Sequence, residues 1–139
     1  MAVLFVLLLT QTLGDKVSFQ SIEKHLTSNF QVPMEKFVTT EKEWVELWGQ
    51  RQEPKDKKRQ HPAVDFDRDV VVVAALGPKP GTGYTIEITR IARTKDEIQI
   101  YLRKTAPDPA ALKAGGPTSP FVLVKMPKPD RFVRFYDEK

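Results

Sequence analysis

The chain has 139 residues, the size of one domain, and its 40% hydrophobic and 29% charged residues suit a soluble protein with a buried core. The net charge of +4 is a mild excess. Its one dense basic cluster, residues 55–59, lies between prolines and contains no aromatic residue, which indicates a solvated loop and not a nucleic-acid surface. The absence of cysteine excludes disulfides, a thiolate zinc site, a cysteine nucleophile and lipid attachment through cysteine.

The N-terminal segment is apolar and carries no charged side chain before Asp15. Its apolar run, residues 2–9, is too short for a bilayer, which requires about 20 residues. The run has the length of the apolar region of a signal peptide. We therefore expect residues 1–14 to be a signal peptide, residues 15–139 to be a single β domain, and the protein to be exported. A buried first strand is the alternative.

The next segments predict short strands and one helix. Residues 17–38 are extended, and Pro33 places its part of the chain at a sheet edge because proline cannot donate a ladder hydrogen bond. The helix is expected over about residues 40–48, with Thr40 and Glu43 as a capping box and a stop at Gly49. The spacing of Trp44, Leu47 and Trp48 places them on one face of this helix, and such a short helix requires a packing partner for that face. Four large apolar residues are assigned structural roles: Trp44, Leu47, Trp48 and Phe66.

The second half of the chain has the pattern of a β protein. Residues 50–64 form a polar loop, and the continuous apolar run of residues 69–76 predicts a central strand covered on both faces. Further strands are predicted over residues 84–92, 98–104, 121–128 and 131–138, the first two as a hairpin with one solvent-facing side. The expected fold is mainly β: an antiparallel sandwich or half-open barrel with one short helix packed on it.

No segment of the chain carries a recognisable reaction centre. The stretch GPKPGTGYTIEITRI, residues 77–91, is rich in glycine but leads into a strand and lacks the Lys-Ser/Thr of a phosphate-binding loop. The alternating acids of residues 65–69 lack the glycine turn and terminal glutamate of a calcium loop, so we interpret them as a solvated strand entry. His25 and His61 accompany no nucleophile motif, which makes a small hydrolase an outside option. We predict no enzyme, cofactor or metal.

Two Gly/Pro-rich loops, residues 77–84 and 113–121, are the predicted recognition surface. Binding residues concentrate on loops that a rigid scaffold holds, and loops stiffened by proline lose less entropy on binding. Tyr84 is a large amphipathic contact, although it would also suit a turn that caps the core. The predicted partner-binding residues are Lys79, Pro80, Gly81, Thr82, Gly83, Tyr84, Gly115, Gly116, Pro117, Thr118 and Pro120.

The order of these features resembles the PrcB C-terminal domain family from about Val17 to the C-terminus. The motifs are EWVELW, the VDF that precedes the predicted central strand, the valine run of that strand, GPKPGTGYTIEI and the terminal TSPFVLVKMP. The matching residues are Trp44, Leu47, Trp48, Asp65, Phe66, Gly77, Pro80, Gly83, Tyr84, Ile86, Ile88, Pro107, Thr118, Pro120, Val124 and Pro127. The resemblance implies a non-catalytic domain of an exported protein that helps a secreted protease to assemble or remain stable. The cysteine that anchors some members to lipid is absent, so we expect no stable membrane insertion.

A weaker resemblance concerns the two loops alone. KPGTGY (79–84) and KAGGPTSPF (113–121) are similar to loops of the chagasin-type inhibitors of cysteine proteases. The third motif of those inhibitors is missing in its usual form. This resemblance implies, as the alternative function, a protease inhibitor that wedges its loops into the protease cleft.

Overall fold

The structure is a computed structural model that describes residues 14–51, 60–111 and 115–138. The predicted signal peptide, apart from Gly14, and the basic cluster at residues 55–59 lie outside these ranges. No helix in the described ranges is long and apolar enough to cross a bilayer.

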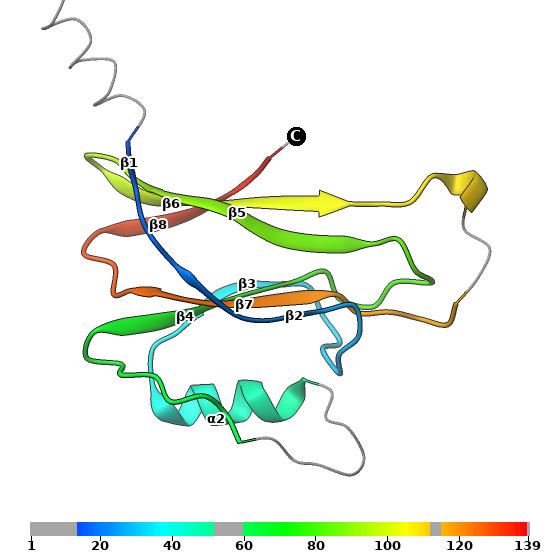
Figure 1. The fold of residues 1–139 in the computed structure, drawn as a ribbon, viewed down its shortest axis with the longest axis horizontal. Helices are drawn as coiled ribbons and strands as arrows, with labels where there is room; N and C mark the ends of the chain where they lie inside the picture. Colours follow the sequence, from blue (N-terminus) through cyan, green and yellow to red (C-terminus); the bar gives the residue numbers. More distant parts are fainter. Residues whose placement is uncertain (1–13, 52–59, 112–114, 139) are drawn as a thin grey trace, which may run out of the picture.

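The chain forms a mainly β sandwich with one helix on its outside (Figure 1). One sheet, here called the outer sheet, has the strand order β1-β5-β6-β8. The other, the central sheet, has the order β2-β7-β4-β3 and lies between the outer sheet and the helix. The elements are β1 (Asp15–Lys16), β2 (Gln20–His25), β3 (Met34–Val38), α2 (Glu41–Gln50), β4 (Asp69–Ala75), β5 (Thr85–Arg93), β6 (Glu97–Thr105), η1 (Pro109–Ala111), β7 (Phe121–Pro127) and β8 (Phe132–Asp137). The predicted fold class is confirmed, as a sandwich and not as a barrel.

The two middle strands of the central sheet, β4 and β7, are buried on both faces. In β4, Val70 and Val72 pack toward the outer sheet, whereas Val71 and Val73 pack toward the helix, and all four are at most 1% exposed. This arrangement explains the continuous apolar run, because alternation disappears when both faces of a strand are covered. The prediction of a central strand is confirmed. Strand β3 lies at the edge of the same sheet, directly after Pro33, also as predicted.

Helix α2 starts and ends differently in detail from the prediction. The amide of Glu43 donates to the hydroxyl of Thr40 at 3.2 Å, as a capping box requires. The Glu43 carboxylate, however, accepts hydrogen bonds from the hydroxyls of Thr39 and Thr40 in place of the expected backbone amide. The predicted stop at Gly49 is wrong, since the helix runs to Gln50. Gly49 does not have the positive φ of a helix-ending glycine, so it simply continues the turn.

The outer sheet contains the predicted hairpin and one parallel pair. Strands β5 and β6 pair antiparallel, with a bulge between Ile88 and Arg90 that returns Ile91 to the core side. The last strand, β8, pairs in parallel with β6. A parallel pair needs a long connection, and here the connection includes η1 and β7, so the chain visits the central sheet before it returns.

Candidate functional site

The two predicted recognition loops meet at one end of the sandwich. An isolated antiparallel bridge joins Lys79 to Thr118. The Lys79 amide donates to the Thr118 carbonyl at 2.7 Å, and the Thr118 amide donates to the Lys79 carbonyl at 2.9 Å. The two loops therefore form one continuous backbone unit, although residues 113 and 114 of the second loop lie outside the described ranges.

The side chain of Thr118 adds a third bond between the loops. Its hydroxyl donates to the carbonyl of Gly81 at 2.6 Å, and the side chain is only 7% exposed. Gly81 is itself buried and has no positive φ. We therefore assign it a structural role, in which its carbonyl accepts the hydrogen bond from Thr118. This bond ties the middle of the first loop to the segment that precedes β7.

Replacing Thr118 with valine is expected to lower the free energy of unfolding by about 1–3 kcal/mol, the typical cost of leaving a buried acceptor without its donor. The shape of the side chain is nearly preserved, so the effect reports the hydrogen bond to Gly81. Urea denaturation of the purified protein measures it. Thr105→Val is the matched control because Thr105 is exposed on β6. Equal stability losses in both variants would contradict a role for this bond.

Two glycines allow close approach between segments of this end. Gly83 has a φ of 95°, and a Cβ placed on it would lie 2.6 Å from the Cβ of Pro107. Gly115 has a φ of 89°, and a Cβ there would lie 2.7 Å from the methyl group of Thr82. A side chain at either position would be strained and would also collide with its neighbour. These glycines thus let the two loops and the segment around Pro107 pack together.

The predicted partner-binding residues divide into those that face solvent and those that hold the loops. Three are buried and shape the surface from beneath: Gly81, Thr118 and Pro120. Two are half-buried, Lys79 and Tyr84, with the Lys79 ammonium 5.5 Å from the centre of the Tyr84 ring. The exposed members are Pro80, Thr82, Gly83, Gly115, Gly116 and Pro117.

A third segment, residues 26–33, joins the same end and was missed by the sequence analysis. The Ser119 amide donates to the Leu26 carbonyl at 3.0 Å, and the Ser28 hydroxyl donates to the Ser119 carbonyl at 2.8 Å. The Ser119 hydroxyl in turn donates to the Phe30 carbonyl at 2.8 Å. The cluster Ser28-Asn29 with Pro33 was the available turn signal, but the sequence analysis treated this segment as extended. We call residues 26–33, 77–84 and 115–120 together the loop end.

The third segment contributes exposed apolar side chains and a polar hollow to the loop end. Leu26 is 44% exposed and Val32 57% exposed. Beside them is an open hollow of about 350 Å³ between the segments. Its lining residues are Thr27, Ser28, Asn29, Phe30, Gln31, Pro78, Pro117, Thr118 and Ser119.

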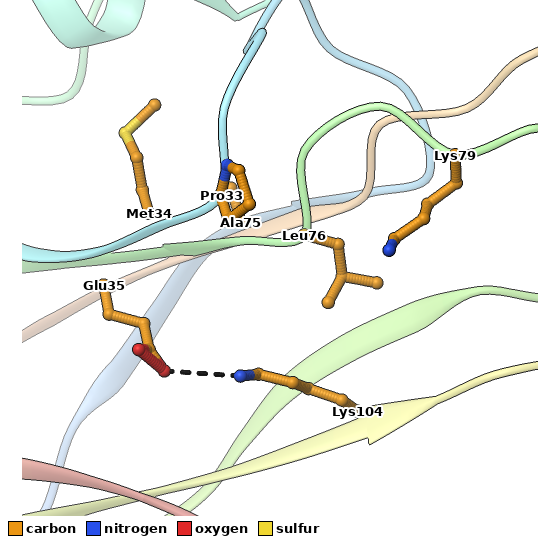
Figure 2. A pocket seen from close by; sticks show the side chains of 7 residues that line it. All are labelled: Pro33, Met34, Glu35, Ala75, Leu76, Lys79 and Lys104. Carbon is orange, nitrogen blue, oxygen red and sulfur yellow. Dashed lines mark hydrogen bonds and ion pairs between the residues drawn. The ribbon is translucent and has the colours of Figure 1, made fainter.

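A second open pocket, here called the lysine groove, lies where the first loop leaves the central sheet (Figure 2). Its volume is about 310 Å³, and its lining residues are Pro33, Met34, Glu35, Ala75, Leu76, Lys79 and Lys104. The Lys104 ammonium lies 3.4 Å from a Glu35 carboxylate oxygen and 3.0 Å from one of Asp137. Burial alone would lower the pKa of Lys104, but the hydrogen bonds and charges of Asp137 and Glu35 outweigh it and raise this pKa above its usual value.

Two side chains weighed above as candidates for metal binding or catalysis, those of Asp65 and His61, have structural contacts instead. The Asp65 carboxylate accepts a hydrogen bond from the Asp67 amide at 3.1 Å, which is a turn at the entry to β4. His61 lies 3.5 Å from a carboxylate oxygen of Glu41 and packs against the edge of Trp44. Within the described ranges, no three His, Asp or Glu side chains are grouped so as to hold a metal ion.

Comparison with known proteins finds a family to which part of the chain is similar. Residues 70–127 match the family model described as PrcB C-terminal. This segment includes the bridge between the two loops, and it confirms the family resemblance over β4 to β7. The match indicates a protease-complex-associated domain. No curated protein and no solved structure matched significantly, so the similarity to chagasin-type inhibitors remains a prediction.

Proposed function

We propose, because residues 70–127 match the PrcB C-terminal family model, that this protein is an exported, non-catalytic domain that binds a secreted protease through its loop end. The observation that carries the proposal is the bridge between Lys79 and Thr118, which unites the two glycine-rich loops into one surface. The domain would assist the assembly or the stability of the protease.

The rigid backbone and the exposed apolar residues of the loop end favour a role in binding over a role as a simple connection between strands. A surface whose backbone is already fixed loses less conformational entropy when a partner binds. The three segments are tied to one another by backbone bonds and by the buried hydroxyls of Thr118 and Ser119. At the same time, Leu26, Val32 and Pro117 remain exposed at this end, as contact residues for a protein partner must.

The serine hydroxyls of the loop end also argue against catalysis there. Ser28 donates its hydroxyl hydrogen to the Ser119 carbonyl, and Ser119 donates its own to the Phe30 carbonyl. A nucleophilic serine would instead donate to a general base such as histidine. The proposed role is therefore recognition without chemistry.

Protease inhibition is the second candidate, and the adjacency of the loops favours it. A wedge-type inhibitor requires two glycine-rich loops side by side at one end of a sandwich. The contact between Gly115 and Thr82 provides this arrangement. An activity assay separates the two functions, because an inhibitor abolishes the activity of the captured protease whereas an assembly factor leaves it unchanged or raises it.

The test is capture of partners from the native exported fraction with the tagged full chain, read by mass spectrometry. We expect a protease to be recovered by the native protein and to be lost with Tyr84→Ala. The expected loss in affinity is about 2 kcal/mol or more, which corresponds to roughly 30-fold, as for a contact residue at the centre of an interface.

The control is Tyr101→Ala, which removes a half-buried tyrosine from the solvent-facing side of the outer sheet. Circular dichroism melting establishes that both variants are folded. If Tyr84→Ala unfolds the domain, Tyr84 caps the core and the contact role is wrong. Recovery of no protease, or equal recovery by all three proteins, would contradict the proposed function.

A further inference from the structure

The lysine groove combines an apolar lining with a cation that forms no ion pair among the residues the structure describes. Pro33 and Leu76 supply apolar surface along the groove, whereas the Met34 side chain points to the helix side of the central sheet. Two lysines, Lys79 and Lys104, also line it. Figure 2 shows Lys104 directed to Glu35, whereas the Lys79 side chain reaches from its loop toward Leu76.

The two lysines differ in the acidic side chains that surround them. Lys104 has two acidic neighbours, Glu35 and Asp137, within 4.0 Å. Lys79 forms no ion pair with any residue in the described ranges, and its ammonium lies over the Tyr84 ring, 5.5 Å from the ring centre. Such a cation–π contact leaves the ammonium able to pair with a carboxylate. Among the described residues, the Lys79 ammonium is therefore the positive charge of the groove that has no acidic partner.

The position of Lys79 is fixed at its backbone. Both its amide and its carbonyl are bonded to Thr118, at 2.7 and 2.9 Å. The side chain therefore starts from a rigid point at the rim of the groove, and only its own torsions must be ordered when an anion binds. The backbone amide is not available to the anion. This leaves a single point charge, which suits a carboxylate better than a phosphate, since phosphate sites gather several donors.

We propose that the lysine groove receives an acidic side chain of the protein partner, with its carboxylate paired to Lys79 and a neighbouring apolar residue packed on Leu76. The inference rests on the proposed function, because it places the groove at the edge of the same protein-binding end. It specifies what the partner presents there: an Asp or Glu next to an apolar residue in an exposed segment.

The test uses a phage-displayed library of random dodecapeptides, selected on the full chain and counter-selected on Lys79→Met. We expect the selected peptides to be enriched in Asp or Glu adjacent to an apolar residue. Fluorescence polarisation then measures the dissociation constant of a selected peptide and of its copy with Gln or Asn in place of the acid. Removing either charge is expected to weaken binding about fivefold to twentyfold, between the range for exposed pairs and that for desolvated interface pairs.

Two further variants identify the groove as the site. Lys79→Arg retains the charge and is expected to keep most of the affinity, while Lys95→Met removes an exposed lysine from the β5–β6 turn and is expected to change nothing. The inference is overturned if selection gives no acidic enrichment, if the neutral peptide binds equally, or if Lys95→Met weakens binding as much as Lys79→Met.

Failure of the inference is distinguishable from failure of the proposed function. Capture of a protease that is lost with Tyr84→Ala but retained with Lys79→Met would overturn the groove inference alone. Acid-dependent peptide binding without any captured protease would overturn the protease partner and leave the groove as an acidic-peptide site.

Discussion

Trp44→Ala is expected to lower the free energy of unfolding by about 3–5 kcal/mol, the usual cost of removing a buried aromatic side chain from a core. Trp44 is fully buried, with 0% exposure, and its ring centre lies 5.5 Å from that of Trp48. Its indole nitrogen donates to the Pro62 carbonyl at 2.8 Å, which ties the segment before β4 to the helix. The variant therefore loses both packing and this tether.

Chemical denaturation, followed by far-ultraviolet circular dichroism, measures the effect on Trp44→Ala. Val45→Ala is the control on the same helix, since Val45 is 47% exposed and its loss should change stability by about 0.5 kcal/mol at most. Trp44→Phe keeps an aromatic ring but not the donor, and its expected stability is intermediate. A Trp44→Ala variant as stable as Val45→Ala would show that the helix does not contribute to the core.

The sequence predicted best those elements whose burial determines the local pattern of apolar residues. The uninterrupted run of β4 indicated a strand covered on both faces, and the structure buries it between the outer sheet and α2. The spacing of Trp44, Leu47 and Trp48 indicated one apolar helix face, and that face packs on the central sheet. In both cases the local pattern is a direct consequence of what covers the element.

The sequence could not predict how the strands are ordered in space. Strands β7 and β8 are separated by only a short proline-containing turn, yet they belong to different sheets. The parallel pairing of β8 with β6 depends on the path of the whole chain, which leaves no local signal. The end of α2 was misjudged for a related reason: the usual glycine cap of a helix requires a positive φ, which Gly49 does not have, and composition alone does not reveal φ.

For the candidate site, the two loops were predicted, but which of their residues are buried and which face solvent was not. Gly81, Thr118 and Pro120 were grouped with the contact residues, whereas the structure buries all three. The third segment, residues 26–33, was missed because it joins the loop end through hydrogen bonds to Ser119, far away in the sequence. Local sequence patterns do not predict contacts between segments that are far apart in the chain.

Phe30 links the loop end to the core, and Phe30→Ala should therefore affect stability and binding together. Phe30 is 1% exposed and packs edge-on against Phe121 at the start of β7, with ring centres 5.4 Å apart. We expect a stability loss of about 3–5 kcal/mol, as for other buried phenylalanines. Because Phe30 also anchors residues 26–33, partner affinity should fall even at temperatures where the variant remains folded.

Phe132→Ala provides the matched comparison, because Phe132 is 66% exposed on β8 and its truncation should change stability by about 0.5 kcal/mol at most. Urea denaturation of both variants gives the stability difference, and partner capture well below the melting temperature gives the binding difference. If Phe30→Ala loses stability but binds its partner normally, then residues 26–33 do not belong to the contact surface, and the loop end reduces to the two glycine-rich loops. If both properties fall together while Phe132→Ala changes neither, the rigidity that the core imparts to the third segment is part of recognition.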